Sequence, residues 1–290
     1  MTIVKNQSMY PQMIKNLFWQ IQMRSIQLAA KEQDLTSLAR QLSRIVPDIS
    51  DQYTRHIADS PFRRIKGRTQ HAFQIRMVLN ALDFMDISVS NQPFLICDIG
   101  DSSGNHITYL KQILIRDKRF TQRTVDFLGV NLDPVAVEKI RSKGFKAVLC
   151  RAEDLSNKIS RADIVLSFEM LEHLYDPISF LNAISENNIC DCFVMTVPYL
   201  KQSRVGLRHI RRQELRVVSP ENTHIFELSP DDWKLIFMHS GWRVADECIY
   251  RQYPIKSIFA LTKPLWKHFD FEGFYGVVLK RDRKWADCYK

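Results

Sequence analysis

A turn of small residues is the feature of this sequence best suited to hold a ligand. The turn Asp98-Ile99-Gly100-Asp101-Ser102-Ser103-Gly104 follows the apolar run Phe94-Leu95-Ile96-Cys97 and precedes a segment with helical spacing. Gly100 and Gly104 let a ligand approach the backbone where a side chain would block it, and the helix start offers free amide groups to a polar ligand. The spacing does not complete the dinucleotide-binding fingerprint, so a purely structural turn is the alternative.

A second feature is a run of positive charge over residues 200–222. Only Glu214 and Glu221 oppose its six cations, which are Lys201, Arg204, Arg208, Arg211, Arg212 and Arg216. This run favours an acceptor that carries phosphate or carboxylate groups, and a solvated loop without a ligand is the alternative. The whole chain has the same sign, because 41 Lys and Arg against 32 Asp and Glu give a net charge of +9.

Alternating strand and helix patterns position both features. Short apolar runs separated by amphipathic segments predict parallel strands at 94–97, 126–130, 145–149, 162–168 and 192–197. After the basic run we expect a helix over 230–240 and two more strands over 242–250 and 271–279. The first five strands each end in polar or small residues, at the sheet edge where ligands bind in folds of this kind.

The first 90 residues follow a helical pattern instead. Apolar residues recur at intervals of three and four over 10–45, and a further helix is predicted over 69–84. Between them, the basic segment 61–68 is predicted to form a turn. We therefore divide the chain into a helical extension at 1–90, which serves as a cap or a dimerisation element, and a domain at 91–290 with the basic loop 200–222 as an insertion.

Composition indicates a globular protein of the cytoplasm. The chain is 45% hydrophobic and 25% charged, which is enough for a sizeable core. No segment reads as a signal peptide, and no apolar run is long enough to span a bilayer. The six cysteines include no C-x-x-C pair, so neither a zinc site nor a disulfide framework is indicated.

From 94 to 280 the sequence resembles the class I S-adenosylmethionine-dependent methyltransferases. The glycine turn looks like the family's first motif, Gly129-Val130-Asn131-Leu132-Asp133-Pro134 like its second-strand motif, and Ala152-Glu153-Asp154-Leu155 like its adenine-side motif. The stretches 168–177 and 224–230 are similar to its later motifs. The resemblance implies a Rossmann-like, mostly parallel sheet of seven strands with an antiparallel last strand, and S-adenosylmethionine as the cofactor.

The resemblance also implies roles for individual residues. The amino-acid end of the cofactor would be held by Asp98, Gly100, Asp101, Ser102 and Gly104. The ribose would be held by Asn131 and Asp133, and the adenine by Ala152 with Glu153 or Asp154, packed between Leu132 and Phe168. Three residues differ from the family pattern, which makes a non-catalytic binding or scaffold protein an alternative: Ser102, Asn131 and Arg151.

Methyl transfer from a sulfonium is an in-line displacement, and a hydroxyl acceptor must also lose its proton. The candidate bases are His173, His224 and Tyr199. We favour O-methylation of a small or glycan-like anionic acceptor, with no metal assigned, because no N-P-P-Y-like motif for amino groups follows the fourth strand. The alternative is RNA 2′-O-methylation. It follows from the resemblance of four residues to the divalent-metal site of the small-RNA 3′-end 2′-O-methyltransferases: Glu169, Glu172, His173 and His224.

Overall fold

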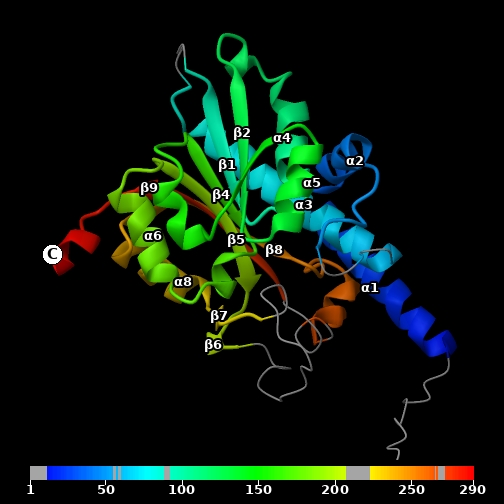
Figure 1. Ribbon diagram of the computed structural model, residues 1–290. Helices are drawn as coiled ribbons and strands as arrows, with labels where there is room; N and C mark the ends of the chain where they lie inside the picture. The colour runs from blue at the N-terminus through cyan, green and yellow to red at the C-terminus, as the bar shows by residue number, and fades with distance from the viewer. Residues whose placement is uncertain are drawn as a thin grey trace, which may run out of the picture.

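A seven-stranded sheet forms the centre of the molecule (Figure 1). The computed structural model describes residues 12–54, 57, 60–87, 92–206, 223–264, 266 and 272–290. Its strands, in spatial order, are β3 (Lys146–Leu149), β2 (Val125–Asn131), β1 (Phe94–Ile99), β4 (Ile164–Phe168), β5 (Cys192–Tyr199), β9 (Gly273–Arg281) and β8 (Trp242–Arg251). The first five strands in sequence pair in parallel, and β9 runs antiparallel to both of its neighbours. The predicted sheet is confirmed.

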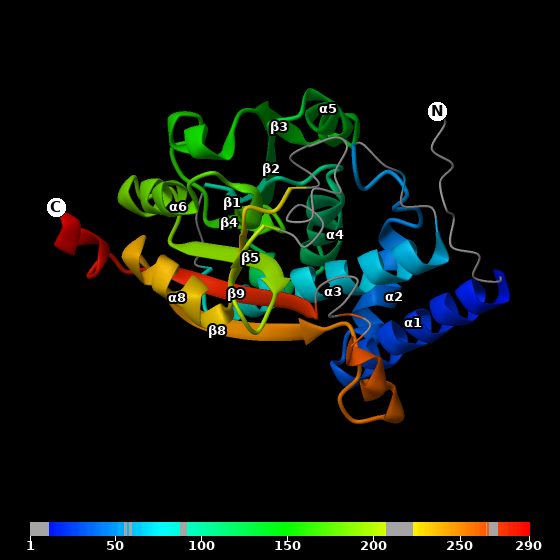
Figure 2. The same ribbon diagram turned by 90° about the horizontal axis from the view of Figure 1, so that it is seen from below.

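Helices cover both faces of the sheet, which explains why its central strands are mostly apolar. Every residue of β4 and β5 is buried. One face packs around Trp233 and Trp242, against α6 (Pro177–Glu186) and α8 (Pro230–His239) (Figure 2). The other face packs around Phe73, against α3 (Pro61–Asp83) and α4 (Asn105–Leu114), and α5 (Pro134–Ser142) lies over β2 and β3.

The N-terminal region is helical, as predicted, but its boundaries differ. The stretch expected over 10–45 is two helices, α1 (Gln12–Glu32) and α2 (Thr36–Ile45), because Asp34 adopts a left-handed backbone with φ 54°. The basic segment 61–68 is not a turn but the first two turns of α3. Its helix start is set by Ser60, whose side chain accepts from the Arg63 amide, and by Pro61 in the first turn.

Helix α3 is part of the hydrophobic core rather than a separate cap. A Cβ atom on Gly276 of β9 would lie 2.7 Å from Cζ of Phe73, so the helix and the sheet are in close contact. α1 and α2 in turn pack against α3. The proposed domain boundary near residue 90 and a dimer through these helices remain predictions.

Shorter elements complete the described chain. Two short strands form a second sheet, β6 (Arg204–Val205) and β7 (Phe226–Glu227). The 3-10 helices are η1 (Lys118–Phe120), η2 (Ala152–Asn157), η3 (Leu171–His173), η5 (Ile258–Thr262) and η6 (Ala286–Tyr289). Most of the predicted basic loop, including four of its cations, lies at 207–222, outside the described residues. No described helix is long and apolar enough to cross a membrane.

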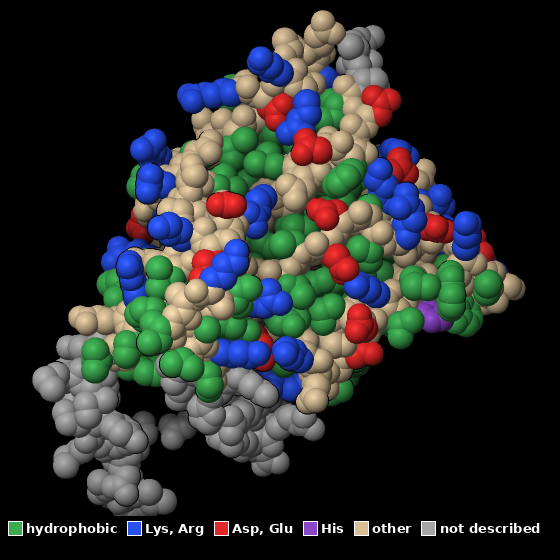
Figure 3. Space-filling view, turned by 180° about the vertical axis from the view of Figure 1, so that it is seen from behind, with side chains coloured by type: hydrophobic (Ala, Val, Ile, Leu, Met, Phe, Trp, Pro, Cys, Tyr) green, Lys and Arg blue, Asp and Glu red, His purple; other side chains and the backbone are tan. Residues whose placement is uncertain are grey.

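The surface charge is mixed on the face opposite to that of Figure 1. Figure 3 shows Lys and Arg side chains there interspersed with Asp and Glu, with apolar side chains between them. A surface that binds an extended polyanion carries a continuous field of one sign. The net positive charge of the chain is therefore not gathered into one basic patch on that face.

Candidate active site

The first of two adjoining cavities lies at the carboxyl ends of β1, β2 and β4 and has a volume of about 390 Å³. Seven of the residues predicted to bind the cofactor line it, which are Gly100, Ser102, Asn131, Leu132, Asp133, Ala152 and Glu153. They come from the ends of β1 and β2 and from η2. Parallel strands bring their carboxyl ends to one edge of a sheet, which is why these separate motifs meet.

Gly100 lines the first cavity and leaves room in it for a ligand. Its φ of +90° is in the region that favours glycine, and a Cβ atom on it would lie 3.0 Å from Cγ of Met170, another lining residue. Gly104 has φ +73° and begins α4, where Asp101 Oδ1 accepts from the amides of Ser103 and Gly104 at 3.1 and 2.9 Å. Asp101 therefore stabilises the turn through its side chain and does not itself line the cavity.

Asn131 accounts for one departure from the family pattern. Its Nδ2 donates to the Asp101 carbonyl at 3.3 Å, and its Oδ1 accepts from the Asp133 amide at 2.9 Å. An aspartate here could make only the second of these bonds, because a carboxylate has no donor. Asn131 thus ties the glycine turn to the end of β2. Arg151, another departure, pairs at 3.2 Å with Glu153 at the rim.

Five of the predicted cofactor residues do not line the first cavity: Asp98, Asp101, Gly104, Asp154 and Phe168. Phe168 lines the second cavity instead. Asp98 is only 1% exposed, and among the described residues its Oδ1 has no hydrogen-bond partner. A buried carboxylate oxygen without a donor is costly and points to a missing positively charged or donor group.

The second cavity, about 400 Å³, adjoins the first and shares four lining residues with it: Gly100, Ser102, Glu169 and His173. Its walls come from the ends of β1 and β4, from η3, and from α3 with the preceding segment. A ligand in one cavity would therefore lie next to a ligand in the other.

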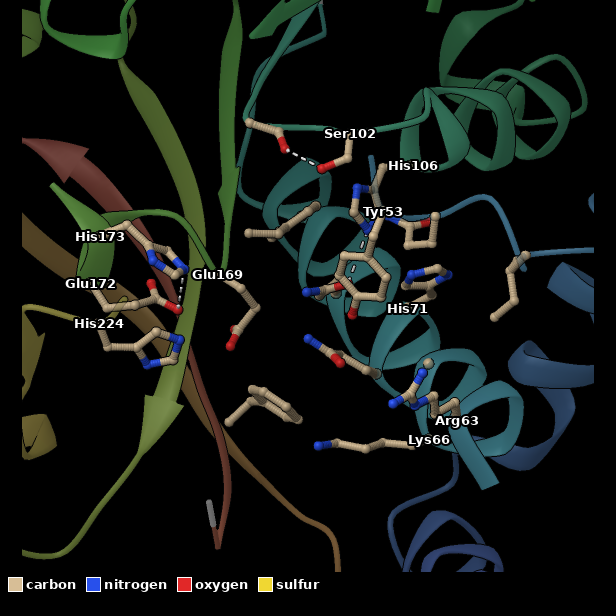
Figure 4. Close-up of a pocket in the computed structure, with 18 of the residues that line it drawn as sticks. Tyr53, Arg63, Lys66, His71, Ser102, His106, Glu169, Glu172, His173 and His224 are labelled. Carbon is tan, nitrogen blue, oxygen red and sulfur yellow. Dashed lines mark hydrogen bonds and ion pairs between the residues drawn. The ribbon is translucent and has the colours of Figure 1, made fainter. Parts of the chain in front are cut away.

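Four ionisable side chains gather on one wall of the second cavity, and we call them the Glu-His quartet: Glu169, Glu172, His173 and His224. Figure 4 shows them facing the cavity from β4, η3 and the segment before β7. One ligand atom from each of Glu172, His173 and His224 lies within 4.8 Å of the others. His224 reaches this wall because the Ile225 amide donates to the Glu172 carbonyl at 2.8 Å.

Glu169 sits in a strained backbone conformation at this wall. Its φ is +53°, which is uncommon for a residue with a side chain, and its amide donates to the Thr196 carbonyl of β5 at 2.9 Å. Strain of this kind costs about 1–3 kcal/mol and persists where surrounding contacts hold it. The turn after β4 is therefore fixed in the conformation that brings Glu169 and Glu172 to the same cavity.

The electrostatics of the quartet fit a cation. Glu172 is fully buried, and among the described residues neither of its oxygens has a hydrogen-bond partner. Burial, followed by the charge of Glu169, raises its pKa well above the ordinary range. A positive ion between the two carboxylates would remove both penalties. Oxygen and imidazole donors together suit divalent cations.

The two histidines are oriented as ligands of such an ion. His173 Nδ1 donates to the Thr223 carbonyl at 2.8 Å, which leaves Nε2 as the unprotonated nitrogen. Burial, followed by His224, lowers the pKa of His173 to about 4. His224 Nδ1 lies 3.1 Å from Glu227 Oε1, the carboxylate partner that often fixes a metal-binding imidazole. The neutral ring of His173 is a weak base at neutral pH and a good ligand.

Tyr199, the third candidate base, lies elsewhere. It ends β5, pairs with Gly273 of β9, and has the Arg251 guanidinium 6.0 Å from its ring centre. It lines neither cavity. Its catalytic role remains a prediction without a contact to support it.

Two residues with no predicted role connect the cavities to the core. His106 Nδ1 lies 3.4 Å from Asp98 Oδ2 and 3.8 Å from Asp101 Oδ2, and its Nε2 lies 3.1 Å from Gln74 Oε1. Gln74 Nε2 also donates to Thr196 Oγ1 at 3.2 Å. His106 follows the glycine turn closely in sequence, and this position could have indicated a place near the site. Gln74 lies 32 residues upstream of His106 on α3, and nothing in the sequence indicates that it reaches the site.

This buried network predicts a pH limit on cofactor binding. Burial, followed by the charge of Asp101 and opposed by His106, raises the pKa of Asp98 to about 6. Burial disfavours the His106 imidazolium, but Asp101 and Asp98 outweigh it and raise the His106 pKa above the ordinary value. The neighbouring His71 stays uncharged, because burial, His106 and Arg68 all lower its pKa. The Asp98 carboxylate is therefore charged above about pH 6, and this charge is lost as Asp98 takes up a proton below it.

We expect the affinity for S-adenosylhomocysteine to fall below pH 6, by up to about tenfold for each pH unit if one proton is taken up. Calorimetric titration at pH 5, 6, 7 and 8 measures this. In the variant His106→Gln the acid limit should move upward, because Asp98 loses its cationic neighbour. An affinity that stays constant from pH 5 to pH 7 in the wild-type protein would contradict the role given to Asp98.

Comparisons with known proteins agree with this geometry. Residues 97–186 match a family model described as a methyltransferase domain. Those residues contain the glycine turn, the second-strand motif and most of the quartet. The chain therefore carries a methyltransferase domain, and the cofactor of such a domain is S-adenosylmethionine. This finding favours an enzyme over the non-catalytic scaffold.

Solved structures share the fold at low sequence identity. One is a chain of the complex between the Haloferax volcanii Trm112 methyltransferase activator and its methyltransferase partner, with 16% identity, TM-score 0.50, and 75% of this chain and 92% of that chain covered. Another is the Burkholderia thailandensis 1,6-didemethyltoxoflavin-N1-methyltransferase with bound S-adenosylhomocysteine. It has 12% sequence identity and a TM-score of 0.50, and the match covers 73% of this chain and 78% of that chain. A third is a Galdieria sulphuraria protein assigned as a sarcosine dimethylglycine methyltransferase. It has 12% sequence identity and a TM-score of 0.51, and the match covers 84% of this chain and 98% of that chain. A search of curated protein sequences found no significant match.

Proposed function

We propose that this methyltransferase acts on the 2′-hydroxyl of a terminal ribose diol, as at the 3′ end of an RNA, with a divalent cation held by the Glu-His quartet. The observation that carries the proposal is the position of the quartet. Glu169 and His173 line both cavities, so a diol bound by the quartet would lie beside the cofactor's cavity. The sequence favoured a small acceptor without a metal, but the convergence of Glu172 and His173 with His224, from two separate segments, favours the metal-dependent alternative.

Some residues of the chain would hold the cation, and others would align the methyl donor with the acceptor. The cation, when bound, would act as a Lewis acid that lowers the pKa of a coordinated hydroxyl and orients it. His173 would be a ligand rather than a base, because its ring, with a pKa of about 4, takes up few protons at neutral pH. His224 would be a further ligand, and the proton of the coordinated hydroxyl would leave to water. Gly100 and Ser102 line both cavities, and their small size would let donor and acceptor approach in line.

Methyl transfer to RNA oligonucleotides with different 3′ ends tests the proposal. With Mn²⁺ and labelled S-adenosylmethionine, we expect transfer to an end that carries the 2′,3′-diol. An otherwise identical oligonucleotide with a 3′-deoxy end keeps the 2′-hydroxyl but loses the second ligand oxygen, and should react at least about a hundredfold more slowly, a barrier difference of about 2.7 kcal/mol. Equal transfer to both ends, or transfer that a chelator leaves unchanged, would exclude this mechanism.

A small or glycan-like anionic acceptor is the second candidate. The observation in its favour is the size of the second cavity, because about 400 Å³ is typical of small-molecule sites. Ribose 5-phosphate offers a diol and a phosphate without a polynucleotide, and so serves as the probe. Methylation of this probe with none of RNA would support the second candidate over the first.

A further inference from the structure

The α3 wall of the second cavity carries a histidine to which the proposed chemistry gives no part. His71 lines this cavity and is only 4% exposed. Figure 4 shows its ring across the cavity from His173 and His224. Burial, followed by the charges of His106 and Arg68, keeps the pKa of His71 well below the ordinary value. His71 is therefore a neutral ring with one N–H donor and one acceptor nitrogen.

A chain of hydrogen bonds that begins at Arg68 decides which nitrogen of His71 carries the proton. Arg68 Nη1 donates to the Tyr109 hydroxyl at 2.7 Å, and this hydroxyl lies 3.3 Å from His71 Nδ1. If Nδ1 carried the proton, the Tyr109 oxygen would accept twice, and its own proton would have no acceptor among the described residues. If Nδ1 accepts from Tyr109 instead, every proton of the chain is used. The proton of the neutral ring is then on Nε2.

Both ends of this chain are held by the surrounding structure. Arg68 Nη2 donates to the carbonyls of Val46 and Pro47. Tyr109 is buried on α4, and its ring centre lies 5.7 Å from that of His71. His71 itself belongs to the part of α3 that is buried in the core. The N–H group of His71 is therefore fixed before a ligand arrives, which favours selective binding.

This N–H group has no use inside the chain. His71 Nε2 has no hydrogen-bond partner in the part of the chain that the structure describes. Because Nδ1 faces Tyr109 in the core, Nε2 is the nitrogen left to face the cavity. A buried donor without an acceptor is costly, so a donor of this kind on a cavity wall indicates a ligand atom that accepts from it. A neutral donor suits an uncharged acceptor atom, whereas anionic groups are bound most strongly by charged donors.

Aromatic rings lie close to this donor. Phe168, Phe274 and Tyr53 line the same cavity. The ring centre of His106 lies 5.0 Å from that of His71 and 4.9 Å from that of Phe168. Aromatic side chains of this kind stack on nucleobases. Phe168, which was expected to pack against the adenine of the cofactor, thus lies where it would contact a planar group of the acceptor.

We propose that His71 is a specificity-determining residue for the acceptor, and that its Nε2–H donates to a carbonyl oxygen or ring nitrogen of the terminal nucleobase while the ribose diol meets the quartet. We call this the base subsite. The inference rests on the proposed function and narrows its acceptor to a nucleoside with a hydrogen-bonding base. A nucleoside carries its diol and its base on different carbons of one sugar, so it can reach two opposite walls.

Binding of three ribosides tests the base subsite. Uridine offers carbonyl oxygens and adenosine offers ring nitrogens, whereas phenyl riboside keeps the diol and a planar ring but has no acceptor on the ring. Calorimetry with S-adenosylhomocysteine and Mn²⁺ present measures their affinities without turnover. We expect the wild-type protein to bind at least one of the two nucleosides at least about tenfold more tightly than phenyl riboside. His71→Phe should lose this preference, and His71→Gln, whose amide can still donate, should keep part of it.

His239→Phe is the matched control, because His239 lies on α8 and lines neither cavity. It should keep the preference of the wild-type protein. Nitrogen NMR of the histidine rings is a second measurement, and it needs only the wild-type protein. It should show His71 neutral at pH 7 with its proton on Nε2.

Three results would overturn the base subsite: wild-type protein that binds no nucleoside in preference to phenyl riboside, a preference that His71→Phe retains, or a His71 proton on Nδ1. The proposed function is tested separately by methyl transfer. If the wild-type protein prefers a nucleoside through His71 but methylates neither nucleosides nor RNA ends, the proposed function fails while the base subsite stands. Transfer to a diol end without the preference would give the reverse result.

Discussion

Replacement of Glu172 by glutamine should abolish methyl transfer, with a loss of at least about a hundredfold, and leave the affinity for S-adenosylhomocysteine within about twofold. The amide keeps the size of the side chain but removes the anionic ligand, so the cation is no longer held. The cofactor should be unaffected, because Glu172 lines the second cavity and not the first. A hundredfold loss corresponds to about 2.7 kcal/mol of transition-state stabilisation.

The same variant should not destabilise the metal-free protein at neutral pH. The folded-state pKa of Glu172 is raised above its ordinary value, so the folded protein binds this proton more tightly than the unfolded chain does. Stability is therefore lost as pH rises through the window above the ordinary glutamate pKa, and glutamine removes that loss. Thermal unfolding with a chelator present measures it, and the melting temperature at pH 7.5 should be equal or higher.

Glu186→Gln is the matched control for this prediction. Glu186 lies at the end of α6 and pairs with Lys290 at 2.5 Å, away from both cavities. Its replacement should change neither transfer nor cofactor binding. If Glu172→Gln retains transfer at a level near that of Glu186→Gln, the quartet does not hold a catalytic ion.

Replacement of Gly100 by alanine should weaken cofactor binding by at least about tenfold, or about 1.4 kcal/mol. A Cβ atom there would lie 3.0 Å from Cγ and 3.2 Å from Cβ of Met170, and so would displace a residue that lines the first cavity. The positive φ adds a backbone cost of about 1–2 kcal/mol that acts on folding. Calorimetry with S-adenosylhomocysteine and thermal unfolding separate the two effects.

Gly144→Ala provides a control with the same backbone cost and no close approach. Gly144 has φ +80°, but a Cβ atom on it would meet no atom within 4 Å. Both variants should lose stability, and only Gly100→Ala should lose affinity. Equal affinities in the two variants would mean that the cofactor does not pass near Gly100.

The sheet could be predicted from the sequence because its signals are local. Strands such as β4 are short apolar runs that end at a polar turn, and each such turn carries a recognisable motif. The start of α3 was missed, because the basic segment 61–68 was assigned to a turn although Ser60 and Pro61 are a signal for a helix start. The break at Asp34 depends on a left-handed backbone that a polar residue in a helical pattern does not reveal.

In the candidate site, too, the residues marked by local motifs could be predicted, and those that depend on long-range packing could not. Residues of the first cavity, such as Asn131 and Ala152, follow strands directly, so fold and motif together indicate their place. The contacts of Gln74 with His106 and Thr196 span 32 and 122 residues and depend on how α3 packs on the sheet. Sequence spacing has no information on such contacts. Tyr199 is the reverse case, because the end of β5 is near the ligand edge but its ring contacts Arg251 instead.

Titration of the metal-free protein with Mn²⁺, followed by the paramagnetic resonance signal of the free ion, tests the central claim most directly. The Glu-His quartet predicts one ion bound per chain in the wild-type protein, with no requirement for acceptor, and loss of that ion in Glu172→Gln. A wild-type protein that binds no Mn²⁺ up to millimolar concentration would contradict the account, and so would an ion that Glu172→Gln retains at full affinity.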